Sequence, residues 1–511
     1  MTTLVHDTPQ HSRLMLLPRE LVDNIAAWLP TQDFNALRLT CKDLEAKSFK
    51  YWSECFFKKR QFMIDQFSLQ TLVDISQHAA LSQVMTHLVI GLDELQACHR
   101  RPSVGSFAEF SRWRDAYCAQ KALLYGGGAA DILSTALSNL PRLHTIDIRD
   151  FESSTRYRDV VAGREVPRWR SYGSSRYQQW PRETPWLVGL SGPRTNFVDT
   201  VFTVVLAAVA RSSSAVRNLE VILRNRKICL QDDAFSTFWI PGTLLTNGLP
   251  ALTKLHLDLD ARGLTGSGFP ANFLNMSNHA WLDPSTEYLR RFLALTPNVS
   301  WLRLNFPLHD ELVSSPGSKL MAWLSLRSDF NAPPDAPWGQ GNPVPVALPL
   351  RRLDLGNVTI SLVIIRGLLM KFADLEHIVM RDVRLYFTAS TPDQDEDEDR
   401  TSCEWSRLIR SLNVTGPKLK KLELDRVTEG PPGNLIPIIF LDKHNQKEFS
   451  FSTSIKIDDT STDELADRIW TMMRWTKAYA QQDSEDEGED DDVMDEQFGD
   501  SEDEDEDEGT E

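Results

Sequence analysis

Side chains that could act as nucleophiles, general bases or metal ligands are scattered singly along the 511 residues. Without a Cys-x-x-Cys pair, neither a zinc site nor a disulfide framework is expected from Cys41, Cys55, Cys98, Cys118, Cys229 and Cys403. The 11 histidines include no His-Glu-x-x-His motif, and the sequence has no Walker loop or Gly-x-Ser-x-Gly elbow. We therefore expect a protein that is not an enzyme and that uses neither a metal nor a cofactor.

Arginine and aromatic residues gather in residues 151–198. Seven arginines lie between Arg156 and Arg182, opposed there only by Asp159 and Glu165. Trp, Tyr and Arg most often dominate the binding energy of protein interfaces. This arginine-rich insertion is therefore our candidate for contact with a protein target, through Trp169, Arg170, Tyr172, Arg176, Tyr177 and Trp180. The alternative is that its aromatic side chains pack it against the rest of the chain.

The net charge of −17 comes from residues 483–511, which hold 19 Asp or Glu and no Lys or Arg. The rest of the chain carries 55 basic and 53 acidic residues, and this near-neutral balance makes nucleic acid an unlikely main partner. By composition, residues 483–511 should be a disordered acidic tail. The tail could be an inert solubilising segment, a ligand for basic proteins such as histones, or an internal competitor that shields the arginine-rich insertion. Ser484 and Ser501 resemble acidophilic kinase sites, where phosphate would deepen the charge.

Short amphipathic helices are predicted near the N-terminus. The first has Pro18 in its first turn, ends at Pro30, and places on one face Leu17, Leu21, Ile25, Trp28 and Leu29. The second can be capped by Thr31, and its shared face holds Phe34, Leu37 and Cys41. About 40 residues cannot bury such faces among themselves. Part of this surface should therefore contact the rest of the chain or another protein.

The same residues resemble an F-box over residues 14–55. The matching positions are Leu17, Pro18, Glu20, Leu21, Ile25, Leu29, Pro30, Asp33, Phe34, Leu37, Arg38, Cys41 and Lys42. The resemblance implies docking on a Skp-type adaptor and, through it, on a cullin scaffold. The adaptor-binding positions that it implies are Leu17, Pro18, Leu21, Ile25, Leu29, Pro30, Leu37 and Cys41. Many members carry Trp-Arg after the lysine, where this chain has Asp43-Leu44. The alternative is an ordinary helical hairpin that packs on its own domain.

From residue 85 to about 480, the pattern apolar-x-x-Leu-x-Leu recurs. Seven copies begin at Met85, Leu143, Leu252, Val299, Leu350, Leu375 and Leu419, and a blurred eighth copy spans Leu219–Leu223. The last positions alternate as in a strand, and between copies lie stretches of helical pattern, Val201–Ala210, Ser285–Leu295, Lys319–Leu326, Leu362–Phe372 and Cys403–Leu412. Repeated strand–helix units resemble leucine-rich repeats, although the spacing is irregular. The alternative is an α/β domain without repeats.

We thus expect an α/β protein: a three-helix F-box (14–55), a helical connector (56–84), an irregular leucine-rich-repeat-like α/β solenoid (85–480) and the disordered acidic tail (483–511). The solenoid should carry insertions at 151–198, 328–347 and 388–400. The F-box resemblance implies a non-catalytic subunit of an SCF-type ubiquitin ligase that recruits an unknown target. Alternatives are a ligase-independent F-box scaffold and a histone- or chromatin-associated protein that acts through its tail. Without a visible signal peptide or membrane span, we expect a cytoplasmic or nuclear location.

Overall fold

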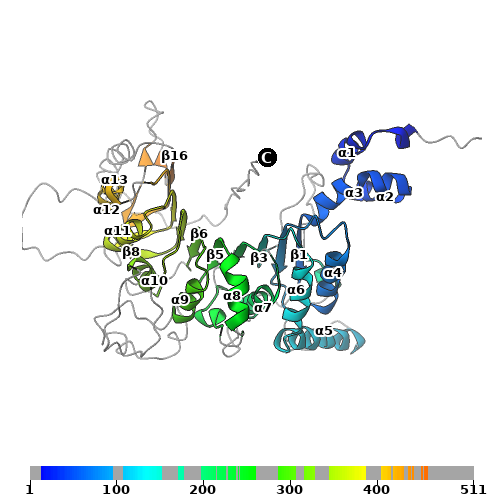
Figure 1. The fold of residues 1–511 in the computed structure, drawn as a ribbon, viewed down its shortest axis with the longest axis horizontal. Coiled ribbons are helices and arrows are strands. Elements are labelled where there is room, and N and C mark those ends of the chain that lie inside the picture. Colours follow the sequence, from blue (N-terminus) through cyan, green and yellow to red (C-terminus); the bar gives the residue numbers. More distant parts are fainter. Residues whose placement is uncertain are drawn as a thin grey trace, which may run out of the picture.

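The computed structural model shows an α/β protein in which N-terminal helices precede a long sheet alternating with helices (Figure 1). The structure describes residues 13–95, 107–151, 171–177, 197–260, 286–306, 316–327, 345–386, 404–430 and short strands up to 458, less a few single residues and pairs within these ranges. The arginine-rich insertion is described only at 151, 171–177 and 197–198. Insertion 388–400 and the acidic tail lie outside the described residues, as does insertion 328–347 before residue 345.

Nine parallel strands form the main sheet, in the same order as in the chain. They are β1 (Lys59–Met63), β2 (His87–Gly91), β3 (Thr145–Arg149), β4 (Asn218–Ile222), β5 (Lys254–Asp258), β6 (Trp301–Asn305), β7 (Arg352–Gly356), β9 (His377–Arg381) and β11 (Lys421–Asp425). A tenth strand, β16 (Ser454–Asp458), pairs antiparallel with β11. Each parallel strand is in register with the next, first residue to first residue. The strands therefore form five straight rows of side chains across the sheet.

The rows explain the repeated sequence pattern. From β2 onward, the second and fourth residues of each parallel strand are apolar and buried under the helices, as Leu255 and Leu257 are in β5. The first, third and fifth residues point to the opposite side, which we call the open face. All eight predicted copies of the pattern are strands in the structure. Strand β1 was not predicted, because Arg60 occupies its second position and the pattern is lost there.

Helices connect successive strands. In chain order they are α4 (Gln66–Gln77), α5 (Phe107–Tyr125), α6 (Gly128–Ser138), α7 (Phe197–Arg211), α8 (Gly242–Gly248), α9 (Glu287–Ala294), α10 (Pro316–Ser325), α11 (Leu362–Lys371), α12 (Glu404–Arg410) and α13 (Leu412–Thr415). They lie along the outer side of the arc that the sheet follows (Figure 1). The five predicted helical stretches correspond to α7, α9, α10, α11 and α12. Segment 56–84, expected to be a helical connector, holds β1 as well as α4.

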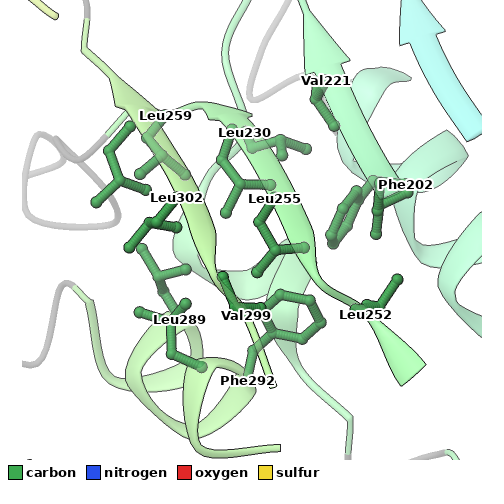
Figure 2. Packing of buried hydrophobic residues seen from close by; sticks show 14 of the residues in the cluster. Phe202, Val221, Leu230, Leu252, Leu255, Leu259, Leu289, Phe292, Val299 and Leu302 are labelled. Carbon is green, nitrogen blue, oxygen red and sulfur yellow. The ribbon is translucent and has the colours of Figure 1, made fainter. Parts of the chain in front are cut away.

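One continuous hydrophobic core fills the space between sheet and helices. At its centre, Phe202 of α7 lies 5.0 Å from Phe235 and 6.2 Å from Phe292 of α9, between ring centroids. Leucines of β5 and β6 and Val299 pack around Phe292 (Figure 2). The three N-terminal helices have a separate small core built on Ala26, Phe34 and Phe56. The described residues therefore form two hydrophobic cores of very different size.

The last three repeats share a turn at the end of their strands. Asn357, Asp382 and Arg426 follow β7, β9 and β11, and all three have positive φ, at 53°, 53° and 46°. The three turns lead into β8 (Thr359–Ser361), β10 (Arg384–Tyr386) and β12 (Thr428–Glu429), which pair in parallel. A fourth strand, β13 (Ile436–Pro437), completes this smaller sheet by pairing antiparallel with β12. A further pair consists of β14 (Phe440–Leu441) and β15 (Phe451–Ser452). Repeated backbone geometry, together with the register, is consistent with a leucine-rich-repeat-like fold.

Within the described part of the chain, no helix is both long enough and apolar enough to span a membrane.

Asp232 begins a short 3-10 helix, Asp232–Phe235, and its side chain is hydrogen-bonded to helix α9. Its carboxylate accepts hydrogen bonds from the backbone N–H groups of Tyr288 (3.1 Å) and Leu289 (2.9 Å), in the first turn of α9. Asp232→Ala should therefore lower the free energy of unfolding by about 1–2 kcal/mol, as for a lost helix cap, in urea titrations followed by circular dichroism. Asp233→Ala, an exposed neighbour, is the control and should change little. Equal effects of both substitutions would contradict this role.

Burial raises the pKa of Asp232 to about 7, although the two backbone donors oppose the rise. The folded chain then binds a proton more readily than the unfolded chain, whose Asp pKa is about 3.9. The stabilisation that the protonated Asp232 contributes to the fold is fully present below pH ~4 and is lost as the pH rises through ~7. Asp232→Asn keeps an acceptor without a charge. Its unfolding free energy should lose less between pH 5 and 7.5 than that of the wild type.

Candidate interaction surfaces

The N-terminal unit is built from α1 (Arg19–Trp28), α2 (Thr31–Leu39) and α3 (Lys42–Phe57). Pro18 and Pro30 stand directly before α1 and α2, at the cap position, so Thr31 is the first helical residue rather than the predicted cap. The residue before a proline is pushed toward extended backbone, and Leu29 indeed leaves the helix at ψ 138°. Pro18 and Pro30 thus determine where α1 and α2 begin.

Helix α3 holds the other two helices. The Arg38 guanidinium lies 3.7 Å from the Trp52 ring centroid, and Trp52 Nε1 donates to Asn35 Oδ1 at 3.3 Å. Lys47 Nζ donates to the carbonyls of Met15 and Leu17 ahead of α1, the latter at 3.1 Å. These contacts, together with the small core, fix the relative positions of the three helices. Asp43-Leu44, the departure from the F-box pattern, lies inside α3, where Leu44 is buried.

Helix α1 packs inward through Val22 and Ala26 and leaves its larger apolar side chains in solvent. The exposed fractions are 47% for Leu21, 39% for Ile25 and 89% for Trp28. Leu16 before α1 and Leu39 at the end of α2 are 70% and 84% exposed. We call Leu16, Leu21, Ile25, Trp28 and Leu39 the N-terminal apolar set. Half of the ten large hydrophobic side chains that are exposed in the described part of the chain belong to it.

The eight predicted adaptor-binding residues divide evenly in exposure. Pro18, Leu21, Ile25 and Pro30 are exposed, whereas Leu17, Leu29, Leu37 and Cys41 are half-buried. Leu29 packs against the small core. Leu16, Trp28 and Leu39 were not among the eight predicted adaptor-binding residues, although periodicity placed Trp28 on the apolar face of the first helix. The sequence signal for these residues is that three short helices contain more apolar side chains than they can bury among themselves.

The open face of the main sheet is the second surface. Its third row is rich in acidic residues, with Asp147, Glu220, Asp354 and Glu423, and its first row holds Lys254, Arg352 and Lys421. Ion pairs join the rows: Lys254 lies 3.0 Å from Glu220, Arg352 2.9 Å from Asp354 and Lys421 3.0 Å from Glu423. The face is therefore an ordered polar lattice, in which the third-row Asp147, Glu220 and Asp354 are buried and the first-row Lys254, Trp301 and Arg352 are half-buried.

Trp301 stands in the first row near the middle of this face. Lys254 Nζ from β5 lies 3.7 Å from its ring centroid, and the Arg352 guanidinium from β7 lies 4.0 Å away. Trp301 Nε1 donates to Asp354 Oδ2 at 3.1 Å. Cation–π contacts and this hydrogen bond hold the indole in place. Trp301 thus gives the face a rigid aromatic group of the kind found at interface hot spots.

A buried carboxylate organises the open face on β3. Asp147 lies 2.6 Å from His87 Nε2 and 2.6 Å from the Arg149 guanidinium. Burial alone would raise the pKa of the Asp147 carboxyl, but the hydrogen bond from His87 and the charges of His87 and Arg149 lower it below its ordinary value. The group therefore stays ionised at neutral pH and anchors the side chains of His87 and Arg149, which is a structural role.

Part of the arginine-rich insertion packs on the first strand. Tyr172 N donates to the Gln61 carbonyl at 2.9 Å, and Tyr177 OH donates to Asp65 Oδ2 at 2.8 Å. The ring of Tyr172 stacks on Phe67. Tyr172 and Tyr177 are thus engaged with the sheet, as the packing alternative expects, whereas Arg176 is exposed beside Phe67. The other candidate residues, Trp169, Arg170 and Trp180, lie outside the described residues, as do Ser484 and Ser501.

Within the described ranges, no three or more His, Cys, Asp or Glu side chains are grouped so that they could hold a metal ion. The chain matches no protein-family model, and no curated protein matches it.

Proposed function

We propose that the chain is the substrate-recognition subunit of an SCF-type ubiquitin ligase. In this proposal α1–α3 are an F-box that docks on a Skp-type adaptor, and the sheet domain is a leucine-rich-repeat solenoid that recruits a target protein. The observation that carries the proposal is the N-terminal apolar set. Helix α1 packs inward through Val22 and Ala26 and leaves Leu21, Ile25 and Trp28 exposed to solvent. The F-box resemblance supplies a partner for this surface.

The N-terminal apolar set would supply part of the binding energy of such a docking. Burying a large apolar side chain completely contributes about 1.5–3 kcal/mol. Because Leu21 and Ile25 are already more than half buried, the five residues of the set supply at most on the order of 10 kcal/mol. Association costs about 4–15 kcal/mol in lost freedom. The set alone would therefore bind weakly. Exposed Pro18 and Pro30, at the helix entries, extend the surface and would add the remaining contacts.

The function would then be transfer by proximity. The solenoid holds a target and the N-terminal helices hold the ligase, so a ubiquitin transfer that is bimolecular in solution takes place at a high local concentration. The chain needs no catalytic group of its own for this. The open face, with Trp301 among fixed charges, is the surface that we assign to the target.

Affinity purification of the full chain from cells with the proteasome blocked tests the proposal. We expect mass spectrometry to identify a Skp-type adaptor and a cullin, together with captured proteins that carry ubiquitin. Leu17→Ala combined with Pro18→Ala should lose adaptor and cullin but keep the captured proteins. Recovery of the adaptor without ubiquitin on any captured protein would instead favour a ligase-independent scaffold. Absence of the adaptor from the wild-type sample would contradict both.

A further inference from the structure

Two arginines on the open face keep their side-chain hydrogen-bond donors unused. Arg303 is the third residue of β6 and Arg381 the last residue of β9, and both residues are half-buried. Among the residues that the structure describes, neither guanidinium takes part in a hydrogen bond, an ion pair or a contact with an aromatic ring. A guanidinium carries five N–H donors and always keeps its charge. These donors are therefore open to water or to a partner.

The acid nearest to Arg303 in the sheet already has other partners. Arg303 lies in the third row between His256 of β5 and Asp354 of β7. The Asp354 carboxylate accepts hydrogen bonds from Arg352 Nε at 2.9 Å and from Trp301 Nε1 at 3.1 Å. Asp354 therefore lowers the local positive potential without satisfying the donors of Arg303.

The fifth-row acids are also engaged. Asp258 accepts a hydrogen bond from Asn305 Nδ2 at 3.1 Å. Asp425, which pairs with Arg381 in the sheet register, lies 3.4 Å from the Arg426 guanidinium. Arg303 and Arg381 thus give this part of the face no excess of positive charge. What they offer a partner is two sets of unused donors.

A partner that covers this part of the face must bring acceptors with it. Removing a guanidinium from water without an acceptor is costly, so a neutral, apolar covering is disfavoured. A carboxylate matches the guanidinium fork with two parallel hydrogen bonds. A doubly charged phosphate would be repelled more strongly than a carboxylate by Asp354 or Asp425 next to each arginine. The face therefore selects carboxylates at two positions.

The register fixes the spacing of the two positions. Arg303 and Arg381 are two strands and two residues apart. At ~4.8 Å per strand and ~3.3 Å per residue, their Cα atoms are about 12 Å apart. An extended chain advances about 3.3–3.6 Å per residue. Acids three or four residues apart in an extended segment would therefore reach both arginines, and Trp301 lies beside the first of them.

We propose that the open face over β6, β7 and β9 binds an extended acidic segment of the target protein. One carboxylate of the segment pairs with Arg303, and a second, three or four residues away, pairs with Arg381. The inference rests on the proposed function, in which this face receives the target, and it names the chemistry that the target presents. It does not involve α1–α3, so it can fail while adaptor docking holds.

Selection from soluble peptide libraries tests the inference. The libraries hold randomised peptides of about ten residues and differ only at two fixed positions three residues apart, which carry glutamate, glutamine or phosphoserine. We expect the purified full chain to enrich the glutamate library at least about tenfold over the glutamine library, the effect of one charge-assisted hydrogen bond. Equal recovery of these two libraries would overturn the inference. Stronger recovery of the phosphoserine library would overturn the assignment to carboxylates.

Substitutions of the two arginines provide the matched comparison. Arg303→Gln with Arg381→Gln should remove the preference for glutamate, whereas Arg303→Lys with Arg381→Lys keeps the charge without the fork and should retain part of it. Arg114→Gln with Arg142→Gln makes the same change at exposed arginines outside the open face and should leave the preference unaltered. Undiminished preference in the Arg303/Arg381 glutamine variant, or equal loss in the control, would overturn the inference.

Two further measurements on the same samples separate the possible failures. Matching thermal unfolding of the variants verifies that they are folded. Adaptor binding reports on the proposed function by itself, because the fixed peptide positions contact only the open face. A wild-type chain that binds the adaptor but shows no preference for glutamate would refute this inference and leave the docking of α1–α3 in place.

Discussion

Replacing Leu21 and Ile25 together by arginine is expected to weaken binding of a Skp-type adaptor by at least about 100-fold, or ~2.7 kcal/mol. Both side chains lie on the exposed side of α1, at 47% and 39% exposure, so each still has surface to bury against a partner. Arginine there replaces an apolar contact by a charge that the interface would have to desolvate. Isothermal titration of the purified full chain with the adaptor measures the change.

The chain offers a matched control for this variant. Val363 and Met370 on α11 are also large exposed apolar residues, at 77% and 65%, and they belong to the other end of the molecule. Val363→Arg with Met370→Arg makes the same chemical change and should leave adaptor binding unaltered. Val22 and Ala26, which pack α1, are intact in both variants, so both should keep wild-type circular dichroism. Undiminished adaptor binding by the Leu21/Ile25 variant would exclude α1 as the docking surface.

The strands could be predicted because their side chains repeat with a fixed period. Leu353 and Leu355 of β7 and Leu422 and Leu424 of β11 occupy equivalent rows, and each pair is visible in its own stretch of sequence. Strand β1 was missed because its packing depends on distant residues. Arg60, at the position of the first leucine, lies near the rings of Phe57 and Tyr172, the second of which comes more than 100 residues later.

The surfaces were harder to predict, since they depend on contacts made in space. Periodicity placed Leu21 and Leu29 on one face of α1, but the packing of α3 buries part of Leu29 and leaves Leu21 in solvent. The cluster of cations around Trp301 has no local signature in the sequence. Lys254 and Arg352 are almost 100 residues apart, and only the common register of β5, β6 and β7 brings both to Trp301.

Phe34→Ala should unfold the N-terminal helices while the sheet domain stays folded. Phe34 is completely buried in a core cluster of only three buried apolar residues, and its ring lies 6.2 Å from that of Phe56 and 5.8 Å from that of Tyr51. Loss of a buried Phe costs about 3–5 kcal/mol of folding free energy, and we expect so small a core to unfold as a result. Hydrogen exchange followed by mass spectrometry should show lost protection in α1–α3 and unchanged protection in β3–β7.

The reverse substitution tests whether the two cores are independent. Phe202→Ala removes a ring of similar size from the large core, beside Phe235 and Phe292. It should lower protection in α7 and the neighbouring strands by about 3–5 kcal/mol and leave α1–α3 unaffected. Adaptor binding should then be lost in Phe34→Ala, through unfolding of its docking helices, and be kept in Phe202→Ala. Loss of protection across the whole chain in either variant would show one cooperative unit, because separate cores can fail separately.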